Sequence, residues 1–151
     1  MTPSSLENHA MKHAVVLTMT VAASLLFAGC ATETTTKESA DAPRITQVES
    51  PQALKNLMAH SDVEVIHSLD HEHFVKGHIP GAVNVDYEKM TESMLPADKD
   101  KPLVFYCAGG GCPVSRMAAD KAIRWGHRNV SVFEGGIKAW QSAGMTVATG
   151  E

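Results

Sequence analysis

Residues 102–113 read PLVFYCAGGGCP, and this stretch decides the fold class of the chain. Its first five residues are an uninterrupted apolar run, which is typical of a central strand buried on both faces of a parallel sheet. Three glycines follow soon after Cys107, and a helix is expected over residues 114–125, where Gly126 ends it. The stretch therefore predicts a strand, a glycine-rich loop and a helix, with a cysteine at the carboxyl end of the strand.

The same alternation extends outward through residues 44–151. The other strands are expected at residues 45–48, 63–66, 82–85 and 130–133. Helices are expected from Pro51, with Ser50 as its N-cap, and at residues 71–75, 87–94 and 137–142. Strands that alternate with helices predict an α/β fold with a mostly parallel sheet. The whole chain has 151 residues, enough for one domain of usual size, and its net charge of −4 makes nucleic acid an unexpected partner.

The first thirty residues predict export. Lys12 and His13 follow Met11, and residues 14–28 carry no charge and are mostly apolar, as in a secretory signal peptide. This run is shorter than the roughly 20 residues that a membrane-spanning helix needs. We expect residues 1–29 to be a signal peptide whose true start is Met11.

The end of this segment, Phe27-Ala28-Gly29-Cys30, resembles the lipobox of bacterial lipoproteins. The resemblance implies that Cys30 is lipidated and that the chain is anchored to a membrane, facing the periplasm. Ala31, next to the cysteine, implies the outer membrane. The alternative is an ordinary signal peptide cut elsewhere, which leaves Cys30 a free thiol. Residues 30–43 are polar and predict a flexible tether before a domain at residues 44–151.

Three segments of the domain resemble the rhodanese-like domain family. Residues 74–82 (FVKGHIPGA), the loop after Cys107 and residues 133–140 (FEGGIKAW) follow the order of that family's signatures. The resemblance covers residues 44–151. It implies a five-stranded, mostly parallel sheet flanked by helices on both faces, with the reactive Cys107 at the end of a central strand.

The loop after Cys107 suits a reactive thiolate. Small residues let the backbone curl with its N–H groups turned inward, and the following helix adds its positive end. The resemblance implies that Cys107 takes a sulfane sulfur from a small anion or a persulfide donor and passes it to a thiol acceptor, with no cofactor. The expected substrate-binding residues are Ala108, Gly109, Gly110, Gly111 and Cys112.

Two features of the loop depart from the family pattern. Many active members carry Arg or Lys five residues after the cysteine, where this chain has Cys112, and its loop is about two residues longer. Ser115 and Arg116 are the nearest candidates for binding an anion, so thiosulfate is a weaker expectation as substrate. Cys112 is either a resolving thiol that forms a disulfide with Cys107 or an inert loop residue.

A further departure lies after the second strand. His67-Ser68-Leu69 occupies the place where the family usually has Asp, any residue, then Arg. His78 belongs to the GHIPGA signature and is expected to be structural, whereas His67, His71 and His73 are expected on the surface. No metal site is expected, because Cys107 and Cys112 lack further ligands nearby.

The sequence leaves four functions open. A sulfurtransferase or persulfide carrier working through Cys107 ranks first, and a thiol–disulfide redox module using Cys107 and Cys112 ranks second. A phosphatase-like or arsenate-reductase-like enzyme would need an Arg at the end of the loop. A non-catalytic domain that binds a partner protein has no positive feature in the sequence.

Overall fold

The computed structural model describes residues 44–151. The expected signal peptide, the lipidation site at Cys30 and the expected tether at residues 30–43 lie outside the described residues. None of the helices within the described range combines the length and the hydrophobicity that crossing a membrane requires.

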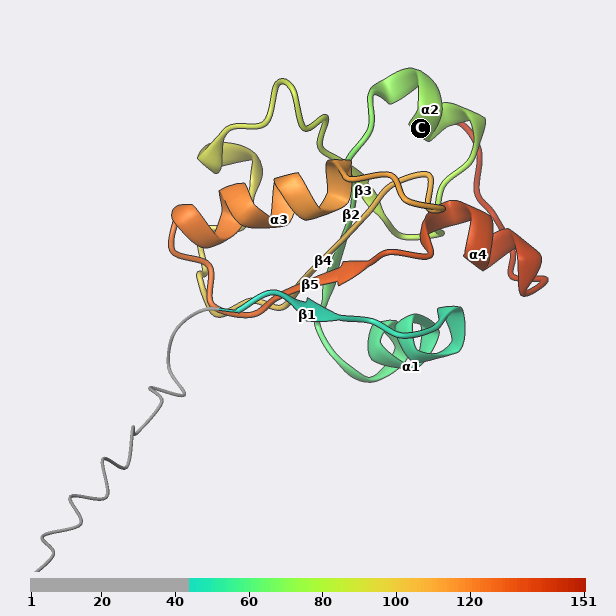
Figure 1. Ribbon diagram of the computed structural model, residues 1–151, viewed down its shortest axis with the longest axis horizontal. Helices are drawn as coiled ribbons and strands as arrows, with labels where there is room; N and C mark the ends of the chain where they lie inside the picture. The colour runs from blue at the N-terminus through green and yellow to red at the C-terminus, as the bar shows by residue number, and fades with distance from the viewer. Residues whose placement is uncertain (1–43) are drawn as a thin grey trace, which may run out of the picture. The chain divides into compact units, whose positions relative to one another are not determined.

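The domain is built on one sheet of five parallel strands, in the order β1-β5-β4-β2-β3 (Figure 1). The strands are β1 (Thr46–Gln47), β2 (Glu64–His67), β3 (Val83–Asn84), β4 (Leu103–Tyr106) and β5 (Val130–Phe133). All four residues of β4 are buried, because this strand has neighbours on both sides and helices on both faces. The expected five-stranded α/β fold is confirmed, and the sheet is entirely parallel.

Four α-helices cover the two faces of the sheet. They are α1 (Pro51–His60), α2 (His71–Lys76), α3 (Val114–Arg124) and α4 (Gly136–Ser142). Figure 1 shows α3 and α1 on opposite sides of the sheet. Successive residues of β4 alternate between two apolar clusters: Phe105 packs with Ala118 and Ala122 of α3, whereas Val104 packs with Leu54 of α1 and Trp140 of α4. Each face of the sheet therefore has its own core.

The prediction of a helix over residues 87–94 is wrong. The structure has a turn there, followed by a single 3-10 turn, η1 (Glu92–Met94). The carboxylate of Asp86 accepts a hydrogen bond from the backbone N–H of Glu88 at 3.0 Å, and Thr91 has an extended backbone. A short polar side chain that bonds to the nearby backbone offers the chain an alternative to the helix, and here that alternative prevails.

Candidate active site

Cys107 lies directly after β4, at the carboxyl edge of the sheet, and only 1% of its surface is exposed. Its Sγ is 3.4 Å from the carbonyl oxygen of Cys112 and 3.5 Å from the hydroxyl oxygen of Ser115. Ser115 belongs to the first turn of α3 and is itself buried. The strand, the glycine loop and the helix therefore enclose the sulfur atom on several sides.

The surroundings of Cys107 favour its thiolate. Burial is the largest single influence and by itself raises the pKa of the thiol. Hydrogen bonds from the Cys112 thiol, the Gly109 N–H group, and the hydroxyl and N–H groups of Ser115 act in the opposite direction. Their sum prevails, so the pKa of Cys107 lies below its ordinary value of 9.0. A lowered pKa is the usual condition of a reactive cysteine.

Cys112 is the second thiol of the site. It is partly exposed, and both it and Cys107 are free thiols. Burial, followed by the hydrogen bond it donates to Cys107, raises the pKa of Cys112 above its ordinary value. The two cysteines therefore have different roles at neutral pH: Cys107 is the better thiolate, and Cys112 is a protonated donor beside it.

The base of the loop is fixed by the segment that follows β5. The backbone N–H of Ile137 donates to the carbonyl of Cys107 at 3.0 Å, and that of Lys138 donates to the carbonyl of Ala108 at 3.2 Å. Gly136 has a φ of +56°, and a Cβ built on it would lie 2.4 Å from both the Cys107 oxygen and the Gly109 nitrogen. Only glycine allows the two backbones to approach so closely.

The GHIPGA segment supports the site from the other side. The backbone N–H of Ile79 donates to the hydroxyl of Tyr106, the residue before Cys107, at 3.0 Å. His78 stacks on Phe74 with ring centroids 3.8 Å apart and exchanges two backbone hydrogen bonds with Ala148. His78 thus has the structural role expected of it, because it joins α2 to the last residues of the chain.

The expectation that His67 lies on the surface is wrong, because the residue is buried. Only 1% of it is exposed, and its ring lies against those of Phe74 and Tyr106, at centroid distances of 5.6 and 5.0 Å. Burial, and then the nearby His78 and His73, lower its pKa to about 4, so the ring is neutral at pH 7. No alternation marked it in the sequence, because the last three residues of its strand are all buried.

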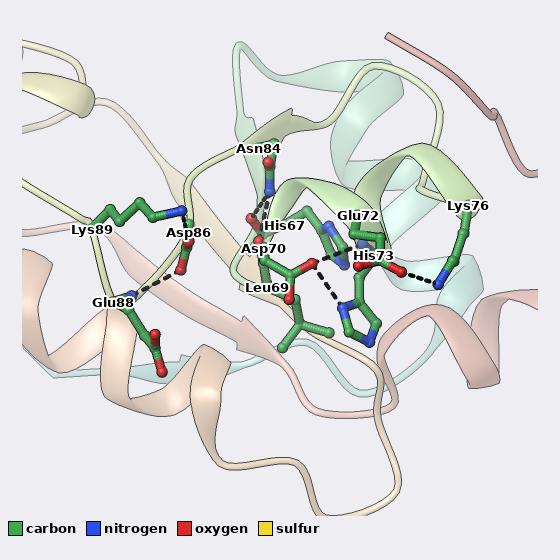
Figure 2. Close-up of polar contacts among 10 residues, drawn as sticks. All are labelled: His67, Leu69, Asp70, Glu72, His73, Lys76, Asn84, Asp86, Glu88 and Lys89. Carbon is green, nitrogen blue, oxygen red and sulfur yellow. Dashed lines mark hydrogen bonds and ion pairs between the residues drawn. The ribbon is translucent and has the colours of Figure 1, made fainter.

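His71 and His73 are exposed, as expected. Figure 2 shows His73 beside Asp70, whose carboxylate caps α2 by accepting from the backbone N–H of His73 at 2.9 Å. Asn84 in the same view ties β3 to the end of β2, donating to the carbonyl of Leu69 at 2.7 Å. Within residues 44–151, no group of three or more metal-ligating side chains is arranged to hold an ion.

Arg116 lies on the exposed side of α3. Its guanidinium group is 3.9 Å from the carboxylate of Glu134, and both side chains are about half exposed. The structure thus brings Ser115 to the sulfur of Cys107, whereas the only contact it gives Arg116 within the described range is with an acidic side chain.

A small pocket next to the loop was not anticipated from the sequence. It has a volume of about 150 Å³ and lies between the end of β2, the segment after β3 and the first residue of α3. Its lining includes Ser68, Tyr87, Val114 and the acidic residues Asp70, Asp86 and Glu88, the last three drawn in Figure 2. The signal for it was available, since the carboxyl ends of neighbouring parallel strands meet at one edge of the sheet.

Known proteins resemble this chain over the same region. Residues 50–143 match the family model described as "Rhodanese-like domain". The thiosulfate sulfurtransferase GlpE of Shewanella oneidensis is 35% identical over 81 residues, which cover 54% of this chain and 78% of that protein. An HTH-type transcriptional regulator of Mycobacterium tuberculosis is 29% identical over 89 residues, and these cover 59% of this chain but 39% of the regulator.

The fold has a counterpart among solved structures. A thiosulfate sulfurtransferase from Pseudomonas aeruginosa superposes with a TM-score of 0.60 at 16% identity. The match covers 71% of this chain and 21% of that one. At this identity the likeness shows the fold alone.

Proposed function

Because the chain belongs to the rhodanese-like domain family, we propose that it is a sulfurtransferase that carries a sulfane sulfur on Cys107. The observation that supports this most is the enclosed, hydrogen-bonded sulfur of Cys107 at the end of β4. The name of the Shewanella oneidensis relative, thiosulfate sulfurtransferase, agrees with this chemistry.

The transfer proceeds in two displacements. The Cys107 thiolate attacks the sulfane sulfur of a donor R–S–S⁻, the S–S bond of the donor breaks, and R–S⁻ leaves. Cys107 then carries the sulfur as Cys107–S–S⁻. A thiolate acceptor next attacks the outer sulfur, takes it as its own persulfide, and leaves Cys107 as the thiolate again. The Gly109 and Ser115 N–H groups support the negative sulfur at rest.

The charges around the loop favour persulfide and polysulfide donors over thiosulfate. Thiosulfate carries two negative charges and is best held by an Arg fork. Here the loop position holds Cys112, and Arg116 faces Glu134. Backbone N–H groups alone suit a donor whose charge is single, as in an organic persulfide, or spread along a soft sulfur chain, as in a polysulfide.

The test is a donor screen on the full chain carrying Cys30→Ser, with Cys107→Ser in that background as the control. Soon after anaerobic mixing with polysulfide and removal of excess, the chain with Cys107 is expected to carry sulfur at the nucleophilic thiolate, a gain of about 32 Da per atom that is read before any later loss of the outer sulfur. The Cys107→Ser control should gain none, and thiosulfate should load the protein more slowly. If neither donor gives sulfur bound at Cys107 or sulfur passed on from it, the proposal is wrong.

We further propose that the protein is exported and anchored to the outer membrane, facing the periplasm, through lipids on Cys30. The charge-free run before Cys30 and the small residues next to it support this assignment. Its acceptor would then be a thiol of the same compartment.

A further inference from the structure

The two cysteines of the loop are in direct contact. The Cys107 Sγ is 3.4 Å from the carbonyl oxygen of Cys112. Both are free thiols, and five positions separate them in the chain. The loop has folded back, so Cys112 is already placed beside the sulfur that would carry the persulfide.

The two partners differ in how firmly they are held. Cys107 ends a buried strand, and its carbonyl is fixed by the N–H of Ile137. Gly110 and Gly111, which precede Cys112, are exposed, and an added Cβ would meet nothing within 4 Å at either position. A glycine pair in open space gives the backbone freedom to bring Cys112 the last distance to Cys107.

We infer that Cys112 is a resolving thiol that discharges the Cys107 persulfide as hydrosulfide, a second outcome for the sulfur that rests on the proposed persulfide. The Cys112 sulfur attacks the inner sulfur of Cys107–S–S⁻ and forms a Cys107–Cys112 disulfide. The bond between the inner and outer sulfur breaks, and the outer sulfur leaves with the proton of Cys112 as HS⁻. A dithiol reductant then supplies two electrons and two protons to restore both thiols.

The placement of Cys112 favours attack on the inner sulfur. The backbone of Cys112 lies against the Sγ of Cys107 itself, with 3.4 Å between this Sγ and the Cys112 carbonyl oxygen, and this Sγ becomes the inner sulfur once the persulfide forms. The pKa of Cys107 is lowered and that of Cys112 is raised, so Cys107 loses its proton more readily and is the first of the two thiols to react with the donor. The acceptor of the outward transfer has to arrive from solution, whereas Cys112 is always present.

The experiment follows the mass and the released sulfide together. The full chain with Cys30→Ser is loaded anaerobically with a limiting amount of polysulfide, and free sulfide and intact mass are recorded over time. The chain with both loop cysteines is expected to end about 2 Da lighter than the reduced protein, with sulfide released as the disulfide forms. The Cys112→Ser variant should keep the adduct of about 32 Da and release little sulfide.

Each result has a distinct meaning. If the chain with Cys112 holds its adduct as long as Cys112→Ser does, and releases no more sulfide, the resolving role is refuted while the proposed function stands. If neither protein ever gains sulfur, and neither releases sulfide or forms a disulfide, both ideas fail. Mapping the Cys107–Cys112 disulfide in the unsubstituted loop provides a second reading that does not depend on the variant's folding.

Discussion

The sulfur of Cys107 meets different partners in its two protonation states. As a thiol it donates toward the Cys112 carbonyl and the Ser115 hydroxyl. As a thiolate it accepts from the Cys112 thiol and from the Gly109 and Ser115 N–H groups. Ser115 serves both states because a hydroxyl can donate or accept, so its removal tests how far hydrogen bonding offsets the burial of the charge.

We predict that Ser115→Ala raises the pKa of Cys107, because the thiolate loses a hydroxyl donor. The rate of Cys107 alkylation by iodoacetamide rises with pH through that pKa, since the thiolate is the reactive form. A lowered pKa places the midpoint of this rise below pH 9.0 in the unsubstituted protein, and Ser115→Ala should shift it upward.

The matched control is Ser131→Ala on β5, whose hydroxyl contacts Thr46 instead of the active site. It should leave the midpoint where it is. Equal midpoints for Ser115→Ala and the unsubstituted protein would show that the hydroxyl does not stabilise the thiolate.

Single residues also show where sequence reasoning succeeds and where it fails. The position of Cys107 at the end of a buried strand is predictable because its signal is local: an apolar run before it and glycines after it. His67 was misjudged, because its burial depends on the rings of Phe74 and Tyr106, one of which comes from another strand. The polarity of a side chain does not by itself predict whether neighbouring residues bury it.

Among the elements, the turn between β5 and α4 matters as much to the site as β4 and α3. The sequence predicts β5 and α4 with ends that lie within a residue of those in the structure. Their meeting was not derivable from local pattern, because the contact joins Gly109 to Gly135 and Gly136 across the fold. The family resemblance marked this second glycine pair without giving its physical reason.

We predict that Gly136→Ala destabilises the domain by about 2–4 kcal/mol, because the new methyl group would meet backbone atoms that cannot yield. Gly144→Ala is the matched control: its φ is also positive, at +71°, but nothing lies within 4 Å of an added Cβ. It should cost about 1 kcal/mol from the backbone alone.

Urea unfolding of the two variants separates the clash from the backbone strain. Gly136→Ala should also slow the alkylation of Cys107, since the displaced loop includes the donor Gly109. Equal losses of unfolding free energy in the two variants would contradict the role given to the close backbone contact.

On the scale of the whole molecule, the domain carries the proposed chemistry and the proposed anchor sets its location. The contacts described for the Cys107 site all lie within residues 44–151, and the proposed anchor would decide where that site operates. The strand order β1-β5-β4-β2-β3 is known only from the structure, whereas the existence of the strands and their parallel arrangement were expected from the alternation of strands with helices.

We predict that Cys30→Ser moves the protein from the membrane fraction to the soluble fraction of an expressing bacterium. Acyl chains contribute about 0.8 kcal/mol per buried CH₂ group, and the substitution removes their point of attachment. Fractionation with a high-salt wash, followed by detergent extraction, measures the change. Cys112→Ser should stay in the membrane fraction, and a soluble protein in both cases would refute the anchor.

The contact between Gly109 and Gly136 fixes the first half of the active-site loop, whereas an added side chain at Gly110 or Gly111 would meet open space. Side chains at these two positions therefore contact neither the sheet nor the base of the loop. The second half of the loop can therefore be lengthened, or an Arg in it replaced by Cys, through changes in a few codons and without changes elsewhere in the fold. Selection for a new sulfur compound then acts on a short stretch whose variation the fold tolerates.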